Sequence, residues 1–239
     1  MAKSVSFPDL ILHEDEDYII LNKPYGIPTL DDRDQTIKGM LRLAKEYWAE
    51  AQACHRLDKE TSGILVMAKH PEAYRHLAIQ FENREVNKVY HALVDGLADL
   101  KERMVDLPIF AMNNGIVRID YEEGKEAQTI FNTLDVFKRH SLVQCEPVTG
   151  RMHQIRIHLS CIKHPIIADR QYGGKDVYLS ELKKKFNLKK ETDEIPLIRR
   201  VALHSFSIGF FQLSGEPLYV EAPYPKDMEA LLNQLKKNV

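Results

Sequence analysis

A run of five apolar residues at positions 64–68 follows directly on a polar segment that begins at His55. A short continuous apolar run bounded by polar residues is typical of a strand that is buried on both faces. The segment ahead of it reads HRLD at positions 55–58, so a guanidinium and a carboxylate lie close to the start of the expected strand. Loops that a rigid strand holds in place often carry functional side chains. The pattern therefore predicts a site around Asp58.

Hydrophobic periodicity along the rest of the chain predicts a mixed set of strands and helices. Apolar or alternating runs predict strands at 18–21, 64–68, 86–94, 116–119, 127–134, 141–145, 201–211 and 217–222. Apolar residues at helical spacing predict helices at 36–50, 71–83, 149–162 and 226–235. The three middle strands, separated by short polar turns, favour an antiparallel meander. Residues 175–200 are polar and lysine-rich, and we expect them to form an excursion from an otherwise compact domain.

Composition describes an ordinary globular chain. It has 239 residues, 44% of them hydrophobic, and a mean hydropathy of -0.35, which suits one domain over 1–239 or two subdomains that share one sheet. No apolar run approaches the roughly 18 residues of a membrane span, and we expect a cytoplasmic protein without a membrane partner. The three widely spaced cysteines include no CxxC pair, so we expect reduced thiols.

The charge of the chain is unevenly distributed. The whole chain holds 33 lysines and arginines against 35 acids, yet residues 139–204 hold 13 against 7. Local cation density, and not the sum over the chain, sets the attraction to a phosphate backbone. This segment is therefore a candidate nucleic-acid face, although the lysines at 183–185 fit a solvated helix equally well.

Arg156 lies in the dense polar segment 149–158, within an expected helix whose other residues are largely apolar. Its position relative to Met152 and Leu159 directs its stem along the buried edge of that helix. A partly buried guanidinium requires an acidic partner. Pairing with Asp58 would satisfy this need, keep the carboxylate ionised and fix its direction, as a nucleophile requires.

The histidines offer a metal site as an alternative interpretation. Ten histidines are present, and the candidates are His55, His153, His158 and His204. His153 and His158 are five residues apart, so they fall on different sides of a helix, unlike the pair of an HExxH motif. Hydrogen-bonded histidines are the better interpretation, and we predict no metal site.

Five short segments together resemble the RluA-type family of RNA pseudouridine synthases. They are NKPYG at 22–26, HRLDKETSG at 55–63, KVY at 88–90, GRMHQIRIH at 150–158 and LH at 203–204. The match spans nearly the whole chain in the expected order. It implies an α+β fold with a mixed, mainly antiparallel bent sheet, flanking helices and a central RNA-binding cleft. It also implies RNA as the partner, and neither a cofactor nor a metal; we expect a monomer.

The resemblance also implies roles for individual residues. Asp58 would be the catalytic carboxylate, acting covalently on the ring or on the anomeric carbon of the target uridine. Arg156 would pair with Asp58, and Tyr90 would pack on the target base and help to remove the proton from ring carbon five. Arg56 would help to fill the space left by the flipped base, which recovers part of the cost of extruding it. The remaining residues assigned to substrate binding or its support are Lys23, Arg151, His153, Gln154 and Leu203.

The main departure from the family concerns the choice of RNA. Many relatives carry an additional N-terminal S4-type RNA-binding module, whereas here the catalytic domain begins almost at once, so we expect RNA selection to come from that domain. Relatives without the module modify 23S ribosomal RNA or transfer RNA, and both substrates stay open. The alternative functions are a non-catalytic RNA-binding or RNA-folding protein that retains the cleft, and a metal-dependent hydrolase.

Overall fold

The computed structural model describes residues 6–31, 37–113, 115–183, 186–187 and 193–238. The chain folds into two compact units. Unit 1 lies within residues 1–89 and 204–223, and unit 2 lies within 90–203 and 224–239. Both units combine helices with strands that are mostly antiparallel, so the predicted α+β class is confirmed.

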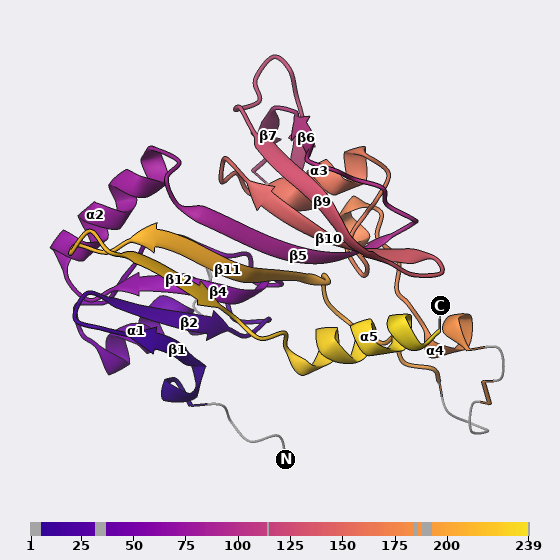
Figure 1. Cartoon of the computed structure of the whole chain (residues 1–239), viewed down its shortest axis with the longest axis horizontal. Coiled ribbons are helices and arrows are strands. Elements are labelled where there is room, and N and C mark those ends of the chain that lie inside the picture. Colours follow the sequence, from indigo (N-terminus) through magenta and orange to yellow (C-terminus); the bar gives the residue numbers. More distant parts are fainter. Residues whose placement is uncertain (1–5, 32–36, 114, 184–185, 188–192, 239) are drawn as a thin grey trace. The chain divides into compact units, whose positions relative to one another are not determined.

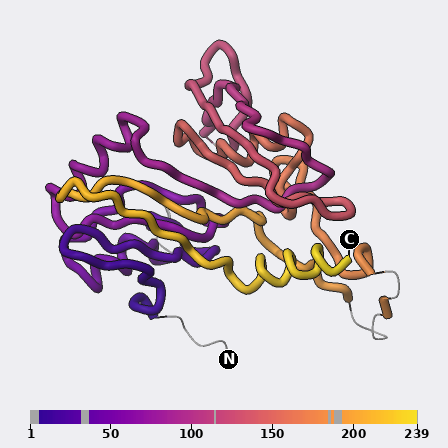
Figure 2. The backbone as a smooth tube through the Cα atoms, viewed as in Figure 1, coloured from indigo at the N-terminus to yellow at the C-terminus, as the bar shows by residue number. Residues whose placement is uncertain are grey.

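Unit 1 contains a sheet in which strands from the two ends of its sequence are neighbours. Its elements are η1 (Pro8–Leu10), β1 (Ile11–Glu14), β2 (Tyr18–Lys23), α1 (Met40–Tyr47), β3 (Gln52–Ala53), β4 (Ser62–Ala68), α2 (Pro71–Glu82), most of β11 (Leu203–Phe211) and β12 (Pro217–Glu221). The strand order is β1-β2-β4-β11, with β3 paired to β4 and β12 paired to β11. All of these pairs are antiparallel except β4 with β11. Figure 2 shows the late segment 204–223 returning beside the early strands of this unit.

Strand β4 is the centre of unit 1. All seven of its residues are buried, as the apolar run at 64–68 predicts. Helix α2 packs on the same core through Ala73 and Leu77. Pro71 occupies its first turn, where a missing backbone N–H costs little. The strand that follows Asp58 is therefore rigid because its neighbours cover both of its faces.

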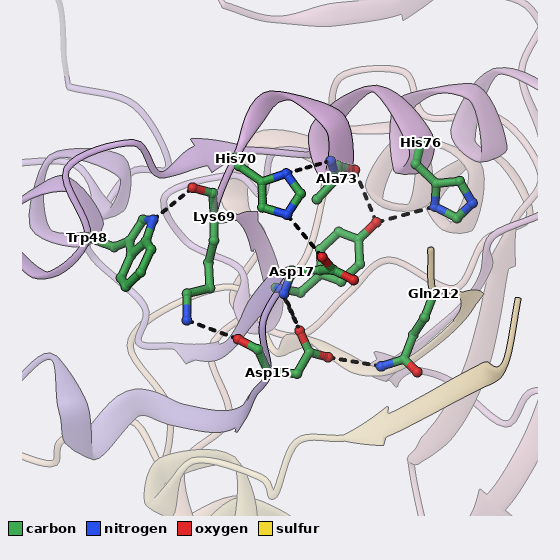
Figure 3. Close-up of polar contacts among 9 residues, drawn as sticks. Asp15, Asp17, Trp48, Lys69, His70, Ala73, His76 and Gln212 are labelled. Carbon is green, nitrogen blue, oxygen red and sulfur yellow. Dashed lines mark hydrogen bonds and ion pairs between the residues drawn. The ribbon is translucent and has the colours of Figure 1, made fainter. Parts of the chain in front are cut away.

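A polar cluster fixes the join between β4 and α2 (Figure 3). Trp48 Nε1 donates to the carbonyl oxygen of Lys69 at 2.7 Å, and Lys69 Nζ lies 4.2 Å from the centre of the Trp48 ring. The ring of His70 accepts the backbone N–H of Ala73 through Nδ1 at 3.3 Å, and its Nε2 lies 3.0 Å from Asp17 Oδ1. His70 therefore caps α2 and ties the helix to the segment before β2.

Unit 2 contains four neighbouring antiparallel strands of the ten-stranded sheet, a separate two-stranded sheet and several helices. Its elements are the greater part of β5 (Asn87–Asp95), β6 (Arg103–Asp106), β7 (Ile109–Ala111), β8 (Val117–Ile119), β9 (Gln128–Val136), β10 (His140–Pro147), α3 (Gln154–Cys161), η2 (Arg170–Tyr172), α4 (Leu179–Leu182) and α5 (Lys226–Lys237). The order of its strands is β5-β10-β9-β6, and Figure 1 shows β9 and β10 as long neighbouring strands. Apolar residues of β5, β10, α3 and α5 share one core.

The structure corrects three expectations. The helix expected at 149–162 begins only at Gln154, because His153 has φ of 54°, a left-handed conformation that an α-helix excludes. The middle strands do not form one meander, since β8 pairs with β7 in a separate two-stranded sheet. The helix expected at 36–50 is shorter, running from Met40 to Tyr47; its first expected residue lies outside the described part of the chain.

The polar segment 175–200 is attached to the core of unit 2 in its described part. Val177, Leu182 and Ile198 are buried and belong to that core. Of the lysines at 183–185, the structure describes only Lys183, which is exposed. Within the described residues, no helix is long and apolar enough to cross a membrane.

Candidate active site

Asp58 lies in the loop between β3 and β4, and its backbone is held by the loop that follows β2. Asp58 is partly buried, and its backbone carbonyl oxygen accepts the N–H of Thr61 at 3.1 Å. The carbonyl of the next residue, Lys59, accepts the N–H of Gly26 at 2.8 Å. Gly26 has φ of 81°, a left-handed conformation that glycine adopts without strain. The turn that carries Asp58 is therefore fixed by hydrogen bonds from a segment more than thirty residues earlier in the sequence.

Lys23, the last residue of β2, supports the same turn through its side chain. Its side chain is fully buried, with an exposed fraction of 0%. Its Nζ donates to the carbonyl oxygens of Pro24 at 2.9 Å, Ile27 at 2.8 Å and Lys59 at 3.4 Å. A buried ammonium is stable only when such acceptors surround it. Lys23 therefore holds the NKPYG loop in its own conformation and connects it to the turn of Asp58.

His55 and Arg56, at the start of the same motif, differ in environment. His55 Nε2 accepts the backbone N–H of Val66 at 3.1 Å, and its ring packs on Phe81. Burial and the charge of Lys88 lower the pKa of His55 to about 3. The ring is therefore neutral at physiological pH and holds the motif against β4. Arg56 is exposed, and its contact with RNA stays a prediction.

In unit 2, Gln154 organises the turn that precedes α3. Its Oε1 accepts from the hydroxyl of Thr149 at 2.7 Å and from the N–H of Arg151 at 2.9 Å. Its Nε2 donates to the carbonyl of Gln128 at 2.8 Å and to the hydroxyl of Thr129 at 3.0 Å. These four bonds engage both ends of the amide within the fold. Gln154 thus fixes the turn on β9, and its contact with substrate stays a prediction.

Arg156 has an acidic partner within its own unit. Its Nε and Nη2 donate to Asp169 Oδ2 and Oδ1, each at 2.7 Å, and its guanidinium lies 5.0 Å from the centre of the Tyr172 ring. Arg156 is 5% exposed and Asp169 is 1% exposed. The expected need for an acidic partner is therefore met by Asp169. Pairing with Asp58, which belongs to the other unit, stays a prediction.

His153 and Arg151 flank this arrangement. His153 Nδ1 lies 2.8 Å from the hydroxyl oxygen of Tyr172, which also accepts the N–H of Val117 at 3.2 Å. Arg151 is exposed, and its Nε donates to the carbonyl of Glu126 at 3.0 Å. Tyr172 therefore supports the ring of His153 through its hydroxyl and the guanidinium of Arg156 through its ring.

The other predicted site residues of unit 2 lie on strands. Tyr90 in β5 is partly buried and packs against the core of unit 2. Leu203, the first residue of β11, is 3% exposed and belongs to that core. Of the predicted site residues, Lys23, Arg56 and Asp58 belong to unit 1, and Tyr90, Arg151, His153, Gln154, Arg156 and Leu203 belong to unit 2.

Sequence reasoning missed Asp169 and Tyr172. The requirement that a buried guanidinium have an acidic partner was correct, but several acids could have met it. Asp169 precedes the short helix η2, and its backbone carbonyl oxygen accepts the N–H of Gly174 at 2.8 Å. A β-carbon on Gly174 would lie 1.8 Å from the carbonyl oxygen of Ile166, so only glycine fits there. The short spacing between an acid and a pair of glycines was the available signal for this tight turn.

The histidines considered as metal ligands take part in hydrogen bonds. His158 Nδ1 lies 2.9 Å from Thr129 Oγ1, and His204 Nδ1 lies 2.9 Å from Ser62 Oγ. Among the residues that the structure describes, no three His, Cys, Asp or Glu side chains come together as a potential metal site. These two histidines therefore contribute hydrogen bonds to the fold.

Comparison with known proteins gives a consistent result. The family model for RNA pseudouridylate synthases matches residues 17–161. "Ribosomal large subunit pseudouridine synthase C" of Vibrio cholerae is 33% identical over 99% of this chain and 72% of its own length. "Dual-specificity RNA pseudouridine synthase RluA" of Salmonella typhimurium is 38% identical over 69% of this chain and 77% of its own length. The solved structure of human RNA pseudouridylate synthase domain containing 4 is similar with a TM-score of 0.69 and 25% identity, covering 95% of this chain and 92% of that one.

The chain therefore belongs to the RNA pseudouridylate synthase family, whose members isomerise uridine to pseudouridine in RNA. The resemblance inferred from the five motif segments is confirmed, and so are the reaction class and RNA as the partner.

Proposed function

We propose that this protein converts a uridine of large-subunit ribosomal RNA to pseudouridine, with Asp58 as the catalytic carboxylate. The observation that carries the proposal is the turn of residues 55–61, which presents a partly buried aspartate from a loop held by Lys23 and Gly26. The relatives named as synthases of the ribosomal large subunit support this choice of RNA. Transfer RNA is the second substrate to be tested.

The reaction requires a base to leave its sugar and return in a new orientation. The bond between N1 of uracil and C1′ of ribose breaks, the base rotates, and a bond forms between C5 and C1′. The proton on C5 is then lost and N1 gains a proton, so atoms and electrons balance without an oxidant or reductant. Asp58 would attack covalently, on the ring or on the anomeric carbon, and be released when the product forms.

The other predicted site residues divide the remaining tasks. Tyr90 would stack on the flipped base and take part in moving the C5 proton. Arg56, being exposed, would take part of the space that the base leaves. Arg156 would keep the carboxylate of Asp58 ionised and oriented, while Asp169 holds the guanidinium at its other edge. The buried Leu203 would form an apolar wall for the uracil ring.

The basic segment 139–204 would supply the attraction to the RNA backbone. Arg151 is exposed within it, and each phosphate contact of this kind releases counterions. Arg151→Ala should weaken binding to all RNA sequences and lower the salt slope by about one contact. Lys183 is also exposed. Weaker RNA binding by Lys183→Ala would place this lysine on the phosphate-binding face, and unchanged binding would show that it is only solvated.

The direct experiment is a map of pseudouridines in ribosomal and transfer RNA from cells with and without this gene. We expect at least one pseudouridine of the large-subunit RNA to disappear and to return when purified protein is added to the unmodified RNA. Loss confined to transfer RNA would overturn the choice of substrate and leave the chemistry standing. An unchanged map, together with inactive purified protein, would contradict the proposal as a whole.

The non-catalytic alternative makes a different prediction for one variant. Asp58→Asn should abolish modification and leave the dissociation constant for RNA nearly unchanged if Asp58 is catalytic. A protein that only binds RNA would leave RNA unmodified with or without this substitution. We also propose that the protein acts as a monomer in the cytoplasm, within reach of ribosomal RNA; sedimentation and cell fractionation test these two points.

A further inference from the structure

Thr29 is a buried threonine that grips the residue preceding Asp58. Its Oγ1 accepts the backbone N–H of Leu57 at 2.9 Å and donates to the carbonyl oxygen of the same residue at 2.9 Å. Thr29 is 3% exposed and Leu57 is 6% exposed, so water is a poor substitute for either bond. One hydroxyl therefore satisfies both backbone groups of a single buried residue.

The position of Leu57 gives this grip its meaning. Leu57 lies between Arg56, which is exposed, and Asp58, which is partly buried. Fixing both the N–H and the C=O of Leu57 restrains the peptide planes on its two sides. The directions in which the side chains of Arg56 and Asp58 leave the backbone are then set together.

Thr29 also connects this loop to α1. Its carbonyl oxygen accepts the N–H of Leu41 at 3.0 Å, and the carbonyl of Pro28 accepts the N–H of Met40 at 2.8 Å. The first turn of a helix has N–H groups without partners inside the helix, and these two carbonyls are the partners of two such groups in α1. The loop is thus anchored on a helix at one end and on β2 at the other.

The grip of Thr29 is matched on the far side of Asp58. The carbonyl of Lys59 is held by the N–H of Gly26 at 2.8 Å and by Nζ of Lys23 at 3.4 Å. Residues of one loop, 23–29, therefore hold the backbone immediately before and immediately after Asp58. Such a double hold restricts the carboxylate to a narrow range of positions, as covalent catalysis requires.

We propose that Thr29 is a positioning residue. Its hydroxyl aligns Asp58 for attack and Arg56 for the space that the flipped base leaves in the RNA. The proposal rests on the proposed function, because it assigns Thr29 a part in that reaction. It goes further in naming a residue outside the five motif segments. Thr29 would act through the backbone of Leu57, to which its hydroxyl is bonded.

The test compares Thr29→Val with Thr29→Ser. Valine keeps the volume of threonine but removes the hydroxyl, and serine keeps the hydroxyl but removes the methyl group. Each variant is measured with enzyme in excess over unmodified large-subunit RNA, at a temperature where circular dichroism finds it folded. We expect T29V to lower the rate constant of isomerisation by about tenfold or more, to leave the dissociation constant for RNA nearly unchanged, and T29S to retain the wild-type rate.

Thr133 provides a matched control in unit 2. Its Oγ1 accepts the N–H of Leu100 at 3.0 Å and donates to the carbonyl of Ala98 at 3.2 Å, so this hydroxyl also makes two backbone bonds, although to two different residues. Thr133→Val should therefore lower stability and leave the rate constant unchanged. If T29V does not fold, Thr29→Ala removes the same hydroxyl with less steric demand and is judged by the same criteria.

The outcomes separate this inference from the proposed function. A folded T29V or T29A with the wild-type rate constant would overturn the role of Thr29 and leave the proposed function intact. Equal slowing by T29V and T133V would assign both effects to general stability and would also overturn it. A wild-type protein that modifies no RNA would overturn the proposed function, and this inference with it.

Discussion

Arg156 and Asp169 form a buried, two-pronged ion pair, in which two parallel hydrogen bonds of 2.7 Å join the guanidinium to both carboxylate oxygens. The planar fork of arginine matches a carboxylate in this geometry and fixes the direction of the guanidinium. The ring of Tyr172 lies 5.0 Å away on one face of the group. The orientation of Arg156 is therefore determined within unit 2.

We predict that Asp169→Asn destabilises the protein and slows isomerisation. Removing one partner of a buried pair leaves an uncompensated charge, which costs about 3–5 kcal/mol. Urea unfolding measures the loss of stability, and single-turnover kinetics on the folded variant measures the loss of rate. A folded D169N with unchanged rate and stability would contradict the assigned role of Asp169.

Arg200 and Asp227 supply the matched control for this substitution. Arg200 donates to Asp227 through Nε at 2.8 Å and Nη2 at 2.9 Å, in the same two-pronged geometry. The side chain of Asp227 is 27% exposed, whereas that of Asp169 is 1% exposed. Asp227→Asn should therefore cost less stability, because water replaces part of the lost interaction, and the rate constant should stay at the wild-type value.

Lys23→Met should destabilise the loop that holds Asp58. The substitution removes the ammonium donor from the carbonyls of Pro24, Ile27 and Lys59, of which only that of Lys59 keeps the N–H of Gly26, and an unsatisfied buried acceptor costs about 1–3 kcal/mol. The free energy of unfolding, measured with urea, and the rate of isomerisation should both fall. Lys38→Met is the control: Lys38 is exposed and pairs with an exposed Glu46, so we expect a change below about 1 kcal/mol. Equal effects of the two substitutions would refute the support assigned to Lys23.

Stability should fall with decreasing pH through the buried His91. Burial lowers the pKa of His91 to about 4, from an ordinary value of 6.5. Between these values the unfolded chain binds a proton that the folded protein does not, so the stability from neutral His91 is complete above pH 6.5 and is lost as the pH falls toward 4. The slope is at most about 1.4 kcal/mol per pH unit.

His91→Gln isolates this contribution. Urea unfolding at several pH values between 7 and 4.5 gives the pH slope of stability for the wild type and for the variant. We expect the slope of H91Q to be smaller, because the titrating group is gone. An unchanged slope would mean that His91 takes up its proton equally in the folded and unfolded states.

Tyr90→Phe should separate stacking from the handling of protons. Phenylalanine keeps the flat ring that would pack on the uracil but lacks the hydroxyl. We expect RNA affinity to be retained and the single-turnover rate constant to fall by about 100-fold or more, the range typical of lost proton transfer. Tyr121→Phe, at a tyrosine that is 77% exposed, should behave as the wild type. A Y90F protein with the wild-type rate would limit Tyr90 to stacking.

Local patterns predicted the fold well wherever burial is continuous or periodic. The apolar run at 64–68 became β4, and the helical spacing after Pro71 became α2, because both elements are determined by the core they face. The start of α3 was missed since nothing in the residue type of His153 requires its left-handed backbone. The next residue, Gln154, is bonded to β9, and such tertiary bonds have no local signal.

The sequence motifs predicted Asp58 and Arg156 as site residues, whose roles stay predictions, and did not predict Thr29 or Asp169. Asp58 and Arg156 belong to dense polar motifs that stand out against apolar neighbours. Thr29 and Asp169 do not, because a threonine in a loop or an aspartate before a turn is common in any sequence. Their importance comes from contacts with Leu57 and Arg156, residues brought close only by folding.

The most direct test of the central claim is tritium release from large-subunit RNA labelled at C5 of its uridines. Formation of the C5–C1′ bond expels the hydrogen on C5, so release counts the conversions to pseudouridine. We predict that the wild-type protein releases tritium equivalent to a fixed, small number of uridines per RNA molecule. Asp58→Asn should release none, at unchanged RNA affinity. Release by Asp58→Asn at the wild-type rate, or no release by the wild type from any large-subunit RNA, would contradict the account.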